Sequence, residues 1–277
     1  MGACLERGAR RLAEAGIPDA RREARLILAH ALGIEPVTVL GYPERPVDDA
    51  DRYEELIARR AAREPLSHLT GRREFWSLEF EVTSTTLDPR ADSETLVEAV
   101  LAAVPDYHAP LSIVDFGTGT GCLLLALLSE FPNATGLGVD IAEETLAVAR
   151  RNAGRLGFAD RAAFAIGNWG ESLTGQFDLI VGNPPYIPAG EIAVLQREVT
   201  DYEPRRALDG GEDGLDAYRR LGPDIFRILR PGGIAALEFG LGQGTAVERL
   251  MLAEGLIAQG FSRDLAGHDR CLTLVKR

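Results

Sequence analysis

The sequence is poor in the residues that build disulfide frameworks and metal centres. Its 277 residues include 3 cysteines (Cys4, Cys122 and Cys271) and 4 histidines. The cysteines are odd in number and far apart, which matches neither a disulfide framework nor a zinc ribbon. The histidines include no pair at metal-ligand spacing. We therefore expect free thiols and no metal ion.

Long hydrophobic runs are also missing. The longest extends from Cys122 to Leu128, whereas roughly 20 apolar residues are needed to span a bilayer. The first residues, 1–16, mix charged and apolar side chains and so lack the continuous hydrophobic segment of a signal peptide. These features predict a cytoplasmic protein that does not contact a membrane.

Positive charge is scarce. The chain has 30 basic and 42 acidic residues, a net charge of −12, and its only lysine is Lys276. Such a charge repels a phosphate backbone unless the basic side chains gather on one face. We therefore expect no direct contact with nucleic acid.

The remaining composition, 45% hydrophobic and 26% charged, is typical of a globular protein with one or two domains. Apolar residues recur at helical spacing up to residue 72, which predicts a small helical bundle. Trp76, Leu78, Phe80 and Val82 then alternate with polar residues, a period of two that predicts a strand and one arm of a hairpin. We expect a helical domain over 1–72, a β-hairpin linker over 73–87 and a catalytic domain over 88–277.

From Leu111 onward, short apolar runs alternate with helix-length segments. Strands are predicted at 111–116, 137–139, 162–166, 179–181 and 234–239, and helices near 122–130, 143–155, 214–229 and 245–254. Alternating strands and helices predict a mainly parallel α/β sheet covered on both faces. Ligands bind such sheets at the carboxyl ends of the strands, so the residues after each strand are the candidates for chemistry.

A glycine-rich turn follows the first of these strands. Gly117, Thr118, Gly119, Thr120 and Gly121 allow a tight turn and close approach of a ligand. The spacing differs from the GxGxxG dinucleotide fingerprint and favours a nucleoside. Asp140 closes the next strand, where a carboxylate can accept hydrogen bonds from ribose hydroxyls. The alternative for Asp140 is a helix N-cap, and both roles are compatible.

The most informative segment is the strand ending in Asn183-Pro184-Pro185-Tyr186. Two consecutive prolines remove two backbone donors and stiffen the loop, so its carbonyl groups are free to face a ligand. The Asn183 oxygen and a backbone carbonyl can accept the two hydrogens of a planar amide, and the Tyr186 ring can stack on that plane. Oriented in this way, a weakly nucleophilic nitrogen can attack an electrophile without a strong base. The alternative is a plain proline turn.

These residues resemble those of the class I methyltransferases that use S-adenosyl-L-methionine to methylate amide or exocyclic nitrogen. Further motifs are similar to those of the protein-(glutamine-N5) methyltransferases that act on peptide chain release factors. They cover about residues 64–277 and comprise the segments 65–71, 73–76, 88–94, 202–204, 207–208, 210–215 and 230–233. The chain departs from the family at Ala91, where proline is usual, and at His68, where tyrosine is usual.

The resemblance implies a Rossmann-like, seven-stranded class I methyltransferase fold with an N-terminal helical bundle. It also implies methyl transfer to the glutamine of the Gly-Gly-Gln motif of release factors, with S-adenosyl-L-homocysteine as the second product. The glycine-rich turn and Asp140 would bind the cofactor together with Asn168, Trp169 and Asn183. The catalytic residues would be Asn183, Pro184 and Tyr186, and the substrate would also contact Pro185, Phe75, Arg90 and Ser93.

Some alternatives stay open. Asn168 and Trp169 could form a turn only, and Phe75, Arg90 and Ser93 could be ordinary packing residues. At the level of function, a ribosomal protein could be the glutamine substrate, and a DNA adenine-N6 methyltransferase, an NAD-dependent dehydrogenase and a cofactor-sensing protein without activity are further candidates. We expect a monomer whose helical domain holds the protein substrate.

Overall fold

The computed structural model describes residues 1–48 and 50–277, which form two compact units. Unit 1 comprises Met1–Arg72 and Gln196–Tyr202. Unit 2 comprises Arg73–Leu195 and Glu203–Arg277. A short segment from the second half of the chain therefore belongs to the N-terminal unit.

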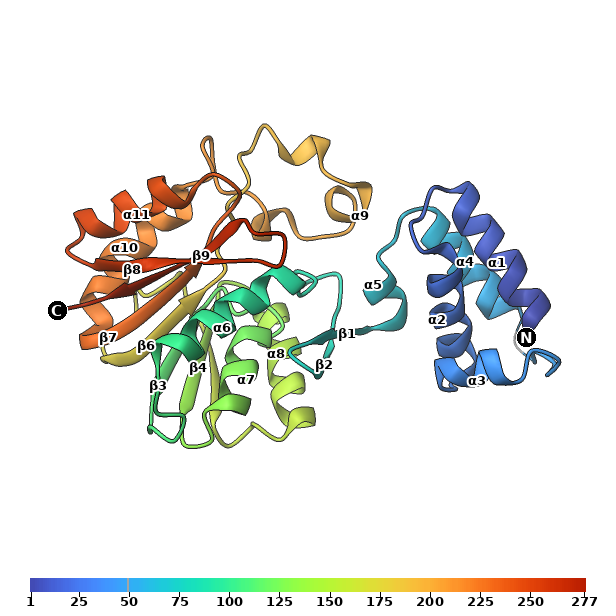
Figure 1. Ribbon diagram of the computed structural model, residues 1–277, viewed down its shortest axis with the longest axis horizontal. Helices are drawn as coiled ribbons and strands as arrows, with labels where there is room; N and C mark the ends of the chain where they lie inside the picture. Colours follow the sequence, from blue (N-terminus) through green and yellow to red (C-terminus); the bar gives the residue numbers. More distant parts are fainter. Residues whose placement is uncertain (49) are drawn as a thin grey trace. The chain divides into compact units, whose positions relative to one another are not determined.

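Unit 1 is helical (Figure 1). Leu5, Leu12, Ile27 and Ile57 are at most 3% exposed and form part of its core, as expected for helices with apolar stripes that pack on one another. Its helices are α1 (Gly2–Glu14), α2 (Ala20–Leu32), α3 (Pro36–Gly41), α4 (Ala50–Ala61), α5 (Leu66–Thr70) and α9 (Arg197–Thr200).

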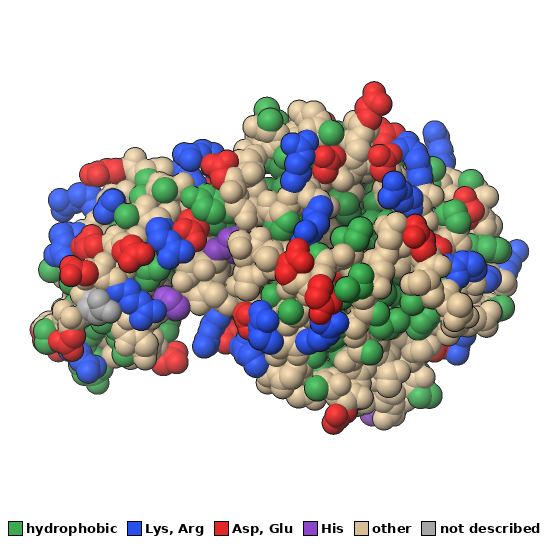
Figure 2. Space-filling view, turned by 180° about the vertical axis from the view of Figure 1, so that it is seen from behind, with side chains coloured by type: hydrophobic (Ala, Val, Ile, Leu, Met, Phe, Trp, Pro, Cys, Tyr) green, Lys and Arg blue, Asp and Glu red, His purple; other side chains and the backbone are tan. Residues whose placement is uncertain are grey.

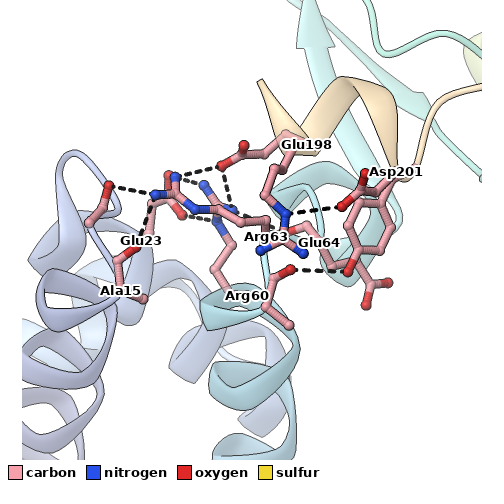
Figure 3. Close-up of polar contacts among 11 residues, drawn as sticks. Ala15, Glu23, Arg60, Arg63, Glu64, Glu198 and Asp201 are labelled. Carbon is pink, nitrogen blue, oxygen red and sulfur yellow. Dashed lines mark hydrogen bonds and ion pairs between the residues drawn. The ribbon is translucent and has the colours of Figure 1, made fainter. Parts of the chain in front are cut away.

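Charged side chains connect α9 to the other helices of unit 1 (Figure 3). The Arg60 guanidinium is 5% exposed and bonds to Glu23 Oε2 at 2.5 Å and to Glu198 Oε1 at 3.2 Å. Arg63 also reaches Glu198 Oε1, at 3.1 Å, and donates to the carbonyl oxygen of Ala15 at 2.9 Å. Glu198 is thus the residue of α9 that both arginines share.

The expected hairpin is confirmed, but its strand is shorter than the predicted 76–82. The structure places β1 at Arg72–Phe75 and β2 at Leu78–Glu81, which form a two-stranded sheet. Trp76 and Ser77 form the turn between them, with φ of 52° and 58°. Positive φ at both central residues is the requirement of a type I′ hairpin turn. The sequence pattern missed it because neither residue is a glycine or an asparagine.

Unit 2 contains a seven-stranded sheet in the order β5-β4-β3-β6-β7-β9-β8. The five strands β5, β4, β3, β6 and β7 run parallel to one another, and β9 pairs antiparallel with both β7 and β8. The predicted Rossmann-like α/β fold is therefore confirmed. The strands are β3 (Ser112–Phe116), β4 (Thr135–Asp140), β5 (Ala162–Ile166), β6 (Phe177–Gly182), β7 (Leu229–Glu238), β8 (Ile257–Arg263) and β9 (Asp269–Val275).

Helices cover both faces of this sheet (Figure 1). Ile113 belongs to the core that contains α6 and α7, whereas its neighbour Val114 belongs to the core that contains α10 and α11. This alternation follows from the two-residue period of a strand. The helices of unit 2 are α6 (Glu94–Ala103), α7 (Cys122–Glu130), α8 (Glu143–Leu156), α10 (Asp216–Ile228) and α11 (Gly244–Ala253), with short 3₁₀ turns η1 (Ala91–Ser93), η2 (Ile192–Val194) and η3 (Arg205–Ala207).

The strand order places a switch point between β3 and β6. The chain continues from β3 through β4 to β5 on one side and then returns to β6 on the other side of β3. Loops that leave two such neighbouring strands diverge at their carboxyl ends and open a crevice for a ligand.

Candidate active site

The glycine-rich turn and the Asn-Pro-Pro-Tyr loop leave the sheet at the same place. Phe116, the last residue of β3, is paired with Gly182, the last residue of β6. Gly117 and Asn183 are the next residues along their chains. The two segments that carry the predicted chemistry are therefore neighbours.

A cavity of about 250 Å³ opens between these loops. All of its lining residues belong to unit 2. Those that the sequence singled out are Gly117, Gly119, Asp140, Asn168, Trp169, Asn183 and Pro185.

The glycine-rich turn presents backbone to the cavity. Gly117, Gly119 and Gly121 have φ of 69°, 57° and 82°, values that L-residues with a side chain rarely adopt. Thr118 and Thr120 are only 4% and 2% exposed and do not face the cavity. The Thr118 hydroxyl donates to Asp115 Oδ2 at 2.6 Å. Thr118 therefore stabilises the turn from behind.

Asp140 joins the turn to the next strand. Its Oδ2 accepts a hydrogen bond from the Gly119 N–H and its Oδ1 accepts one from the Ala142 N–H, both at 3.1 Å. The alternative role as N-cap of α8 is wrong, because the N-cap is Ala142 and has no side-chain cap. Burial raises the pKa of Asp140, and the bonds from Gly119 and Ala142 lower it.

Asn168 and Trp169 form one wall of the cavity after β5. Asn168 Nδ2 donates to Glu171 Oε1 at 2.7 Å. Trp169 has a positive φ of 56°, and a Cβ on Gly117 would lie 3.6 Å from its ring. The indole therefore faces the glycine-rich turn, as expected for a residue that packs on a planar base.

The Asn-Pro-Pro-Tyr loop is held by hydrogen bonds on both sides. Asn183 Nδ2 donates to Ser93 Oγ at 3.0 Å, and the carbonyl oxygen of Tyr186 accepts from Gln243 Nε2 at 2.8 Å. Pro184 is buried, whereas Pro185 lines the cavity. Burial raises the pKa of Tyr186 to about 12, so its hydroxyl stays neutral at physiological pH.

Phe75 and Arg90 do not line this cavity. Phe75 is 1% exposed and packs edge-on against Phe80, with ring centroids 6.3 Å apart. Arg90 Nη2 bonds to both carboxylate oxygens of Glu203, at 2.7 and 2.8 Å. The third of the weaker candidates, Ser93, hydrogen-bonds to Asn183 of the cavity.

Sequence reasoning missed more than half of the cavity wall. Three of these residues, Thr85, Thr86 and Leu87, directly precede the 88–94 motif, which was the available signal. Arg206 closes the wall from η3 and bonds to Glu144 Oε1 at 2.8 Å. Pro204 and Ala207 lie in the motif segments 202–204 and 207–208 but were not assigned to the site. The wall residues without an assignment are Thr85, Thr86, Leu87, Val139, Ile141, Thr145, Gly167, Pro204, Arg206, Ala207 and Arg220.

Two family models match the chain. A PrmC N-terminal domain matches residues 3–71, and a methyltransferase domain matches residues 108–241. A release factor glutamine methyltransferase from Rhodospirillum rubrum is 48% identical, and the alignment covers 100% of this chain and 85% of that protein. The chain belongs to the release factor glutamine methyltransferase family. A Caulobacter vibrioides member is 45% identical over 96% of this chain and 93% of its own length.

The fold of this family member is also found in solved structures of lower sequence identity. The crystal structure of a methyltransferase from Pyrococcus furiosus has a TM-score of 0.53 at 18% identity and covers 80% of this chain and 97% of that chain. At this identity the likeness concerns the fold alone.

Within residues 1–48 and 50–277, no helix is long and apolar enough to cross a bilayer. The same residues contain no group of three or more His, Cys, Asp or Glu side chains that could hold a metal ion.

Proposed function

We propose that this chain transfers a methyl group from S-adenosyl-L-methionine to the side-chain amide nitrogen, N5, of the glutamine in the Gly-Gly-Gln motif of peptide chain release factors. One observation carries the proposal: β3 and β6 are neighbours, so a glycine-rich turn and an Asn-Pro-Pro-Tyr loop border the same cavity. The names of its relatives specify the substrate.

The residues of the cavity fit the cofactor. The turn at Gly117 and Gly119 leaves room that a Cβ would fill, Asp140 can accept from ribose hydroxyls, and Trp169 offers a face to adenine. Bound there, S-adenosyl-L-methionine supplies an electrophilic methyl carbon, whose bond to sulfur breaks as the bond to the amide nitrogen forms. Asn168 would contact the base edge.

Asn183 and the loop behind it would position the nucleophile. Because Asn183 Nδ2 donates to Ser93, its Oδ1 is available to accept one hydrogen of the substrate amide. The Pro184 carbonyl would accept the second hydrogen, and the Tyr186 ring would stack on the amide plane. Fixing the geometry in this way can recover about 7–11 kcal/mol of barrier. The amide proton leaves to water as the nitrogen gains its methyl group.

Unit 1 would supply the protein-binding surface, because one glutamine side chain offers too little area to select a release factor. A duplex DNA substrate would instead need a basic groove. On the face drawn in Figure 2, basic and acidic side chains of the described residues are interspersed. The monomeric state stays a prediction.

Mass spectrometry of a tryptic peptide tests this function. Release factor, ribosomal subunits and an adenine-containing DNA duplex are each incubated with the enzyme and cofactor. We expect a gain of about 14 Da, one added methylene, on the Gly-Gly-Gln glutamine only. Labelling of ribosomal protein or DNA instead would refute the assignment.

Asn183→Ala tests the central residue of the mechanism. The variant should lose on the order of 100-fold in rate, because the nucleophile is no longer oriented. Asn133→Ala is the matched control, since Asn133 only donates to the carbonyl oxygen of His108 at an exposed site. Equal rates for the two variants would remove Asn183 from the mechanism.

A further inference from the structure

A buried carboxyl group lies beside the Asn-Pro-Pro-Tyr loop. Glu238 is the last residue of β7 and is 1% exposed. Its neighbour Leu237 pairs with Gly182, so Glu238 stands level with Asn183 on the adjacent strand. Within the described part of the chain, its Oε2 is buried without a hydrogen-bond partner. Burying a carboxyl group without a partner for each oxygen costs free energy, so its presence here calls for an explanation.

Ser93 links this carboxyl group to Asn183. Asn183 Nδ2 donates to Ser93 Oγ at 3.0 Å. The side chains of Ser93 and Asn183 both lower the pKa of the Glu238 carboxyl group, as polar groups beside it do. Because Ser93 Oγ accepts from Asn183 Nδ2, its own proton is free to point toward Glu238, and an ionised carboxylate can only accept it. An ionised Glu238 thus favours the arrangement in which Asn183 donates to Ser93 rather than the reverse.

The direction matters because an asparagine amide can be flipped with almost no change of shape. If Ser93 donated to Asn183, the amide would present its NH₂ group to the cavity and could not accept from a substrate amide. We propose that Glu238 is a positioning residue which, through Ser93, keeps Oδ1 of Asn183 facing the cavity. The effect on kcat rests on the proposed function, whereas the orientation of Asn183 can be tested without it.

Other charged and titratable groups face Glu238 from each packed element. Asp92 of η1 raises its pKa, and Arg270 of β9 lowers it. Tyr186, Tyr218 of α10 and Cys271 of β9 also interact with this carboxyl group. Burial is the largest influence and raises the pKa of Glu238 to about 7. A protonated Glu238 can donate to Ser93 and so removes the constraint on direction.

The first test observes the amide itself in the cofactor-free full-length protein. The chain has four asparagines, so selective side-chain ¹⁵N labelling gives four NH₂ signals, which single Asn→Ala variants assign. We expect the Asn183 signal to shift in one step with a midpoint near the pKa of Glu238, about 7. The step should disappear in Glu238→Gln.

Asn152 is the internal control, because its Nδ2 donates to the backbone carbonyls of Glu81 and Thr120, at 3.1 and 3.0 Å. Its signal should not show this step. An Asn183 signal that stays still, or that shifts equally in Glu238→Gln, would overturn the proposal.

The second test separates positioning from simple stability. Glu238→Gln and Ser93→Ala should each lower kcat about 10- to 100-fold and leave the affinity for S-adenosyl-L-homocysteine nearly unchanged. The double variant should be no worse than either single variant, because both break one chain of bonds. Ser93→Thr keeps the hydroxyl and should restore most of kcat.

Asp178→Asn is the matched control. Asp178 is a buried carboxylate at the opposite end of β6, where it accepts from the Ser112 hydroxyl at 2.6 Å and pairs with Arg230. This variant should lower the melting temperature but not kcat. Full activity of Glu238→Gln, or additive losses in the double variant, would contradict the positioning role. A wild-type enzyme that methylates no release factor would refute the proposed function instead, while the NMR titration would still test the orientation of Asn183.

Discussion

At the scale of single residues, Asp140 combines two structural tasks in one carboxylate. It fixes the glycine-rich turn through Gly119 and the start of the following loop through Ala142. Both bonds use backbone N–H donors, so the carboxylate is oriented before any ligand arrives. Each carboxylate oxygen keeps a further lone pair with which it can accept another hydrogen bond.

Replacing Asp140 by asparagine tests this arrangement. The amide keeps the shape but loses the charge and one acceptor, and hydrogen bonds to charged groups contribute about 1.5–3 kcal/mol each. We therefore expect about 10- to 100-fold weaker binding of S-adenosyl-L-homocysteine in isothermal titration calorimetry. Asp160→Asn, at an exposed position, is the control. Unchanged affinity in Asp140→Asn would exclude a contact with the ribose.

At the scale of elements, α9 shows how a short helix is stabilised by its partners. A helix of four residues has no independent stability. Within unit 1, Glu198 of α9 accepts from Arg60 and Arg63, and the Tyr202 hydroxyl donates to the carbonyl oxygen of Ala62 at 3.3 Å. Arg60 is buried, so its charge requires the acceptors that Glu23 and Glu198 provide.

Glu198→Gln should therefore weaken the attachment of α9 to the other helices of unit 1. The substitution removes charge-assisted bonds worth about 1.5–3 kcal/mol each, and we expect amide hydrogen exchange over 197–200 to become at least about tenfold faster. Asp201→Asn is the control, because Asp201 pairs with Arg197 at 3.1 Å in an exposed position. Equal exchange rates in wild type and Glu198→Gln would show that apolar contacts alone hold this helix.

At the scale of the whole molecule, the pKa values of three buried carboxyl groups are shifted in the same direction. Burial raises the pKa of Asp115, Glu203 and Glu238 to about 7 in each case. Their ordinary values are 3.8 for aspartate and 4.5 for glutamate. Between these ordinary values and about pH 7, the three carboxyl groups of the folded protein retain protons that the unfolded chain has released. Stability must therefore fall as pH rises through this interval.

This linkage predicts that the melting temperature decreases between about pH 4.5 and pH 7 and then levels off. Carboxylates with lowered pKa values, such as Glu81 and Asp264, act in the opposite sense only below pH 4.5. Differential scanning calorimetry across this range is the measurement. Glu203→Gln should reduce the slope. A melting temperature that rises from pH 5 to pH 7 would contradict the buried state of these groups.

Much of the site could be predicted because its signals are local. The glycine-rich turn and the proline loop are contiguous segments, and each follows an apolar strand. Of the residues predicted in this way, Gly117, Gly119, Asp140, Asn183 and Pro185 line one cavity. The cofactor contacts of Thr118 and Thr120 stay a prediction, and both residues are buried in this structure.

Other residues could not be found from the sequence. Glu238 is the end of an apolar strand and carries no motif, and Arg206 belongs to a segment far from the glycine-rich turn. Both enter the site through pairing or packing between distant parts of the chain. Ser93 was a candidate by resemblance, but its contact with Asn183 depends on the placement of η1 beside β6.

The sequence by itself determined the alternating strands and helices, the family and the two loops that carry the chemistry, because these depend on periodicity and on the conformations that glycine and proline allow. Tertiary structure alone decided that β3 and β6 are neighbours, that α9 belongs to unit 1 and that a buried glutamate stands behind Asn183. The physical reason is that strand order and burial follow from long-range packing of the whole chain, which no local segment encodes.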